Sequence, residues 1–123
     1  MREDYFGTGN VSTQMKFNDA ASTTATSVTT KKTRLLGVSA QNSGSAAAYL
    51  RIYDKASAPV PGTDVPKIVF MVPPGGGLVS EKNMAVEFAL GLAFAITSGG
   101  GNTNAGTVAN ANEVVVNLEY YAK

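Results

Sequence analysis

The chain of 123 residues is long enough for one domain with a sizeable core and leaves no length for a second fold. Ten Lys and Arg residues against nine Asp and Glu residues give a net charge of +1, without the basic stripe that a nucleic-acid partner requires. The chain contains no cysteine, histidine or tryptophan, which excludes disulfides, zinc sites built on Cys or His, and Ser-His-Asp or Cys-His catalytic groups. We therefore expect no enzymatic activity, no metal and no cofactor.

Composition also predicts the fold class. Thirteen glycines and five prolines, with no long amphipathic helical period, indicate an all-β domain rich in turns. Two sheets packed face to face are the simplest way for such strands to bury a core. We expect an antiparallel β-sandwich, jelly-roll-like and of roughly seven or eight strands, over residues 31–123. Residues 1–30 would precede it as an extended N-terminal arm and a flexible or edge-strand segment.

Two parts of this N-terminal segment carry large apolar side chains. Tyr5 and Phe6 adjoin each other in a polar stretch, which fits either a frayed terminus or an arm that docks on a neighbour. Met15 and Phe17 share one side of a short strand predicted over residues 13–18. Residues 19–30 are mostly Ala, Ser and Thr, a composition that suits an exposed edge strand or a flexible link.

The next two strands are predicted over residues 34–41 and 48–55, with turn residues between them that favour a hairpin. In the first strand, Leu36, Val38 and Ala40 share one face. In the second, Leu50 and Ile52 point inward. The opposite face then forms an outer stripe of polar and aromatic side chains, namely Tyr49, Arg51, Tyr53 and Lys55.

Residues 84–96 form the stretch around which we expect the core to be built. Large side chains occupy its even positions and, apart from Glu87, small ones occupy its odd positions, so the period of two predicts one or two consecutive strands. The apolar run is about half of the roughly 20 residues that a membrane helix needs, so we expect no membrane partner. Further strands are predicted over 67–72 and 113–121, and residues 78–83 lead into the stretch 84–96. The uncharged loop 97–112 favours a mobile tip or a packing contact.

The carboxylates show no pattern that points to catalysis. Asp54 and Asp64 flank a proline-rich connection, where we expect them to accept hydrogen bonds from backbone amides. Glu87 is expected on an exposed or subunit-facing side. The glycine runs 75–77 and 99–101 match neither a Walker loop nor a dinucleotide fingerprint. The basic cluster of Lys31, Lys32 and Arg34 is expected to solvate a strand end.

Four short motifs in the middle of the chain carry a resemblance. They are YLRIYDKA at 49–56, GTDVP at 62–66, VPPGG at 72–76 and FALGLA at 88–93. Together they resemble small virion proteins of tailed bacteriophages, of the head decoration or cement type, over about residues 35–96. The resemblance implies a β-sandwich or jelly roll on the outside of a capsid, often a trimer, which clamps neighbouring capsomers and has no catalytic residues.

From this resemblance we expect a virion structural protein that is assembled in the host cytoplasm and stabilises the capsid from its exterior. Its partners would be the major capsid protein and further copies of itself, as a homotrimer. Two alternatives stay open: a carbohydrate-binding module that stacks sugars on Tyr49 and Tyr53, and a component of the tail or fibre base. The candidate interaction residues are Tyr5, Phe6, Met15, Phe17, Tyr49, Arg51 and Tyr53.

Overall fold

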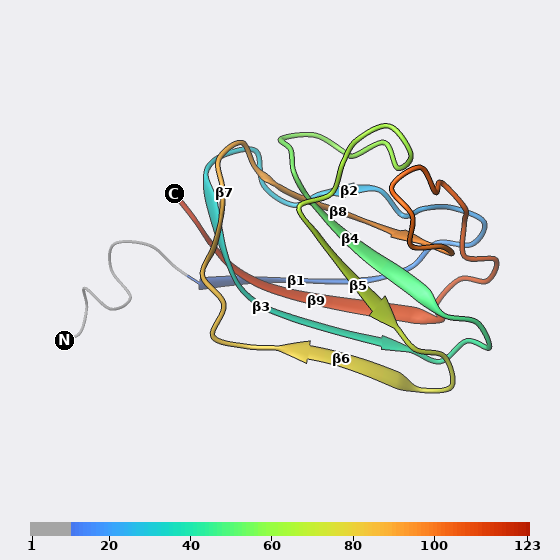
Figure 1. Cartoon of the computed structure of the whole chain (residues 1–123). Coiled ribbons are helices and arrows are strands. Elements are labelled where there is room, and N and C mark those ends of the chain that lie inside the picture. The colour runs from blue at the N-terminus through green and yellow to red at the C-terminus, as the bar shows by residue number, and fades with distance from the viewer. Residues whose placement is uncertain (1–10) are drawn as a thin grey trace.

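Nine β-strands and no helix form residues 11–123, the part of the chain that the computed structural model describes (Figure 1). The strands lie in two antiparallel sheets packed face to face, which confirms the predicted all-β sandwich. The five-stranded sheet has the order β1 (Val11–Phe17), β9 (Val114–Ala122), β3 (Thr33–Asn42) and β6 (Gly77–Glu81), with β7 (Val86–Phe88) also beside β3. The four-stranded sheet has the order β2 (Thr26–Ser27), β8 (Leu92–Thr97), β4 (Ala48–Asp54) and β5 (Ile68–Val72).

The pairing is that of one long hairpin rolled into two layers. β1 pairs with β9, β2 with β8, β3 with β6 and β4 with β5, so the first half of the chain runs back along the second. Rolling places β9 beside β3 and β8 beside β4. This arrangement is a jelly roll, with β7 as an additional short strand.

Side chains from alternate positions of each strand fill the space between the sheets. The alternation predicted for residues 113–121 is confirmed, because the even positions of β9 face the core. Burial of one Leu, Ile or Phe side chain contributes about 1.5–3 kcal/mol, so this layer dominates the cohesion of the two sheets. Its centre consists of Leu50, Ile52, Leu92, Phe94, Ile96, Val114, Val116 and Leu118.

The stretch 84–96 divides into two strands, as the sequence allowed, but they belong to different sheets. β7 lies in the five-stranded sheet and β8 in the four-stranded sheet, and a turn over residues 89–91 joins them. Leu90 therefore leaves the alternating pattern and is exposed. β8 is buried on both faces, with Phe94 in the core and Ala93 and Ala95 beneath the loops on the other side. The small residues thus leave room for a second layer.

The predicted hairpin between β3 and β4 is wrong. β3 lies in one sheet and β4 in the other, because both strands bury one face in the shared core and so stand opposite each other. The connection between them is a corner that the Asn42 side chain holds, since its amide donates to the carbonyls of Ala46 and Val72 and its oxygen accepts from the N–H of Gly44. Turn residues predicted a change of direction correctly, but they do not say which sheet receives the next strand.

The predicted face of β3 is wrong at its start. Leu35 is fully buried and Leu36 is only half-buried, whereas Val38 and Ala40 are buried as expected. A register shift between Leu35 and Gly37 in the pairing with β9 explains the difference, because one additional residue reverses the phase of the alternation.

Residues 11–30, expected as part of an N-terminal arm and a flexible or edge-strand segment, contribute an edge strand to each sheet. β1 pairs with β9 over its whole length, and β2 pairs with β8. The part of the expected arm over residues 1–10 lies outside the described residues.

Candidate interaction surface

Loops cover the outer face of the four-stranded sheet around β4, whereas β5 at the sheet edge exposes Val69 and Met71 on the same face. Arg51 is fully buried there, although it was expected on an exposed stripe. Its Nε donates to Thr97 Oγ1 at 2.8 Å, and its Nη2 donates to the carbonyls of Gly99 and Gly101 at 2.7 Å each. Arg51 thus holds the loop 97–112 against the sheet, which supports the packing contact expected of that loop.

The remaining members of the expected stripe do not form an exposed surface either. Tyr53 is buried, and burial raises the pKa of its phenol. Tyr49 is half-buried, and Gly100 lies directly against its ring. The connection around Gly62 lies against Thr103 of the same loop. The exposed stripe predicted from alternation is therefore wrong at Arg51 and Tyr53, because alternation along a strand does not show that a distant loop covers its second face.

The outer face of the five-stranded sheet carries exposed apolar side chains as well. On β1, Val11, Met15 and Phe17 are 57%, 60% and 45% exposed. The register places Phe17 in one row across the sheet with Val115, Gln41 and Leu78, and Leu78 is exposed as well. Of the candidate residues, Met15 and Phe17 are thus at the surface, whereas Tyr5 and Phe6 lie outside the described residues.

β1 also presents unpaired backbone groups. The N–H of Asn18 donates to the carbonyl of Val114 at 2.9 Å, so the even-numbered residues of β1 direct their N–H and C=O groups towards β9. The odd-numbered residues direct theirs to the opposite edge, where no strand within residues 11–123 pairs with them. We define the β1 surface as this edge together with Val11, Met15 and Phe17.

A hollow lies in the middle of the same outer face. Its volume is about 280 Å³, and its lining includes Thr13, Gly37, Ser39 and Glu119. Gly37 contributes no side chain at the irregular position of β3, which leaves a depression between the neighbouring rows.

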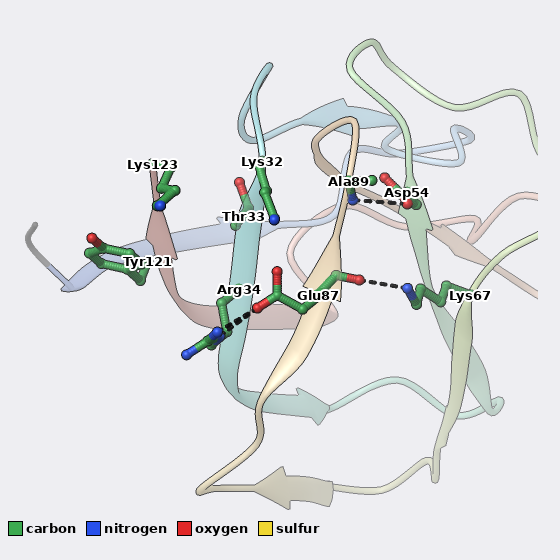
Figure 2. A pocket seen from close by; sticks show the side chains of 9 residues that line it. All are labelled: Lys32, Thr33, Arg34, Asp54, Lys67, Glu87, Ala89, Tyr121 and Lys123. Carbon is green, nitrogen blue, oxygen red and sulfur yellow. Dashed lines mark hydrogen bonds and ion pairs between the residues drawn. The ribbon is translucent and has the colours of Figure 1, made fainter.

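A charged cleft of about 530 Å³ opens at the end of the sandwich where β3 and β7 meet the start of β5 (Figure 2). Figure 2 shows Arg34 and Glu87 pointing towards each other, and Arg34 Nη2 lies 2.7 Å from Glu87 Oε2. The Arg34 side chain holds the pKa of Glu87 below its ordinary value. The charged cleft is lined by Lys32, Thr33, Arg34, Asp54, Lys67, Glu87, Ala89, Tyr121 and Lys123.

Asp54 in this cleft has the backbone role that the sequence predicted. Its carboxylate accepts hydrogen bonds from the N–H groups of Ala89 at 3.1 Å, Leu90 at 2.9 Å and Gly91 at 3.4 Å. Burial acts to raise the pKa of Asp54, but these N–H groups and Lys67 outweigh it and lower the pKa. Asp64 likewise accepts from the N–H of Val60 and pairs with Lys55 at 2.6 Å.

These contacts define the chemistry that the cleft offers. Asp54 and Glu87 are both held in their ionised form, so neither is poised to donate a proton at neutral pH. Within residues 11–123, no group of three or more His, Cys, Asp or Glu side chains has the arrangement of a metal site. The same residues contain no helix long and apolar enough to cross a membrane. The cationic side chains and the ionised carboxylates of the cleft can bind a charged partner.

Sequence reasoning missed several surface residues. Lys32 and Arg34 were expected only to solvate a strand end, and Lys123 carried no prediction. They line one cleft because β3 and β9 pair in the register Thr33 to Ala122. Val11 and Leu78 were also missed, because neither has a large apolar residue two positions away that would mark its side of the strand.

The likeness of this chain to known proteins lies in its structure. No protein-family model matches the sequence, and no curated protein matches it. A solved structure of the Tobacco streak virus coat protein is similar with a TM-score of 0.40 and 10% sequence identity, over 93% of this chain and 86% of that one.

Proposed function

We propose that this chain is a virion structural protein of the head decoration type, which stabilises a bacteriophage capsid through noncovalent contacts with the major capsid protein and with copies of itself. The observation that carries the proposal is the β1 surface, where exposed apolar side chains adjoin an unpaired strand edge. The motifs between residues 49 and 93 resemble those of decoration proteins. This resemblance is the reason for proposing the capsid as the partner and a trimer as the form of self-association.

The β1 surface has the properties of an interface. An exposed strand edge invites pairing with another chain, and soluble proteins usually protect such edges with proline, bulges or charged side chains, including inward-pointing ones. β1 has no proline, and Lys16, opposite Val116 on the side that faces the core, is its one such device. Three apolar side chains on the outer face of β1 add area that a partner would remove from water.

Clamping a shell requires many modest contacts made at once. Repeated engagement of identical subunits raises the overall affinity well above that of one contact, so no deep pocket is needed. The rigid jelly roll suits this use, because its core is continuous and its longest loop is tied down by Arg51.

The carbohydrate-binding alternative loses the surface on which it depended. Sugar stacking needs an open aromatic face, but Tyr53 is buried and Gly100 lies against the ring of Tyr49. A component of the tail or fibre base would use the same kind of noncovalent surface. Locating the protein in virions separates this alternative from a position on the head.

The direct test is the location of the protein in virions. Gold-labelled antibodies against this chain should label the outside of heads in electron micrographs of the phage that encodes it. Label confined to tails would replace the head location with the tail alternative. Virions without label would refute a virion role.

A further inference from the structure

The charged cleft is formed by the ends of β3, β7 and β9 and contains an excess of positive charge. The register pairs Arg34 with both Tyr121 and Glu87, so these three residues form one row on the outer face. Lys32 and Lys123 follow in the next row, where the N–H of Lys123 donates to the carbonyl of Lys32 at 3.0 Å. Figure 2 shows Lys32 and Lys123 on the side of the cleft that lies away from Lys67.

The carboxylates of the cleft are already engaged. Asp54 accepts three backbone N–H groups, and Glu87 accepts both Nε and Nη2 of Arg34 at 2.7 Å. Lys67 donates to the carbonyl of Glu87 and lies over the ring of Phe88 at 5.2 Å. The lining thus holds four cationic and two anionic side chains, and the anionic ones have their own partners.

Lys32 and Lys123 give the cleft its excess of positive charge, and the carboxylate of Glu87, which is paired with Arg34, also attracts both of them. Within residues 11–123, neither ammonium group has a hydrogen-bond or ion-pair partner, and the two residues are neighbours across β3 and β9. Like charges that face each other across paired strands destabilise a sheet. A carboxylate placed between them would remove that repulsion and gain two charge-assisted hydrogen bonds.

We propose that the charged cleft binds an acidic segment of a protein partner, with a Glu or Asp carboxylate seated between the ammonium groups of Lys32 and Lys123. The cleft adjoins the β1 surface, because Tyr121 of the cleft is the strand partner of Val11. The identity of the partner as a shell protein rests on the proposed function, whereas the binding of acidic peptide does not.

A peptide suits the cleft better than a nucleic acid does. Phosphate backbones need a continuous row of cations, but here only Lys32 and Lys123 make no direct ion pair within residues 11–123, and the Glu87 carboxylate that attracts them would repel a phosphate. Tyr121 offers an amphipathic ring next to the charges, which fits the side chains of a peptide.

The test uses the full chain and a fluorescein-labelled hexaglutamate peptide, with binding measured by fluorescence anisotropy at low salt. The variant K32Q/K123Q removes the two ammonium groups of the proposed site. The variant K31Q/K82Q removes two exposed lysines that do not line it and so matches the change in net charge. We expect about tenfold weaker binding for K32Q/K123Q and little change for K31Q/K82Q.

A second readout locates the site. Backbone amide shifts in NMR spectra should change on peptide addition at Arg34, Glu87 and Tyr121, and these shifts report on the cleft whether or not the chain is a virion protein. Equal weakening in both variants, or no binding to the wild type, would overturn the proposal. Tighter binding of a labelled oligothymidylate at the same residues would overturn it in favour of a nucleic-acid site.

Discussion

Arg51 shows how one buried charge organises the covered face of this jelly roll. Its guanidinium is fully buried and donates to three oxygens, all of which lie on Thr97 or on the loop that follows it. Its Nη1 has no partner among the described residues, and no carboxylate balances its charge there. A buried charge is tolerated only where hydrogen bonds compensate its lost hydration. The three acceptors therefore make the loop part of the fold.

Replacement of Arg51 should release this loop. We expect Arg51→Gln to lower the free energy of unfolding by about 2 kcal/mol, because the carbonyls of Gly99 and Gly101 lose a charged donor. Urea denaturation measures the change, and hydrogen exchange should quicken first in residues 98–107. The control is Arg34→Gln at the exposed ion pair, expected to change stability by less than about 1 kcal/mol. Equal losses in the two variants would contradict this role of Arg51.

Asp54 should make stability depend on pH. Its folded pKa lies below the unfolded value of 3.8, so its contribution is present above pH 3.8 and is lost as the pH falls through the folded pKa. Asp54→Ala removes the acceptor for three backbone N–H groups, and we expect it to cost about 1–2 kcal/mol at neutral pH. The difference between wild type and variant, measured by urea denaturation, should shrink well below pH 3.8. A difference independent of pH would show that the charge of Asp54 does not stabilise the turn.

At the scale of elements, the crossing from β7 to β8 depends on Gly91. A Cβ at this position would lie 2.5 Å from the carbonyl oxygen of Thr29 and 2.9 Å from that of Lys55. Both oxygens belong to backbone, which cannot move aside as the tip of a side chain can. The N–H of Lys55 also donates to the carbonyl of Gly91 at 3.0 Å, so the two chains are held at close approach.

We expect Gly91→Ala to destabilise the protein by about 1–3 kcal/mol, because the added methyl group forces these backbones apart. Thermal unfolding followed by circular dichroism measures the effect. Gly101→Ala is the matched control, since a Cβ at Gly101 meets nothing within 4 Å and its φ is not positive. If both variants unfold at the wild-type temperature, close backbone approach at Gly91 is not what this crossing requires.

The residues that form strands could be predicted from this sequence, whereas the sheet to which each strand belongs could not. The alternation at 84–96 and 113–121 is local, and hydrophobic period alone specifies it. The hairpin expected before Ala48 failed because the choice of sheet depends on which strand stands across the core. The exposed stripe failed at Arg51 for a related reason, because its cover comes from residues 97–101. Met15 and Phe17 were predicted on one side of a strand from the period of two, and both are exposed on β1.

Over residues 11–123, both outer faces of the sandwich expose apolar side chains, namely Val69 and Met71 on the four-stranded sheet and those of the β1 surface on the five-stranded sheet. Loops cover the four-stranded sheet around Arg51, whereas the outer face of the five-stranded sheet carries the β1 surface. The jelly roll alone does not assign a function, because the same fold serves unrelated ones. The proposed role in virion assembly therefore depends on whether the β1 surface makes contacts between proteins.

Self-association through the β1 surface gives a test at this scale. If the homotrimer proposed here forms through this surface, light scattering should give three times the chain mass of 12.7 kDa for the wild type. Met15→Ser with Phe17→Ser should shift the protein towards monomer, because the lost apolar contacts no longer offset the entropy of association. The control, Val65→Ser with Leu90→Ser, removes two exposed apolar side chains that lie outside β1. A wild type that stays monomeric at high concentration would contradict the trimer, and equal loss in both double variants would contradict the assignment of the contact to β1.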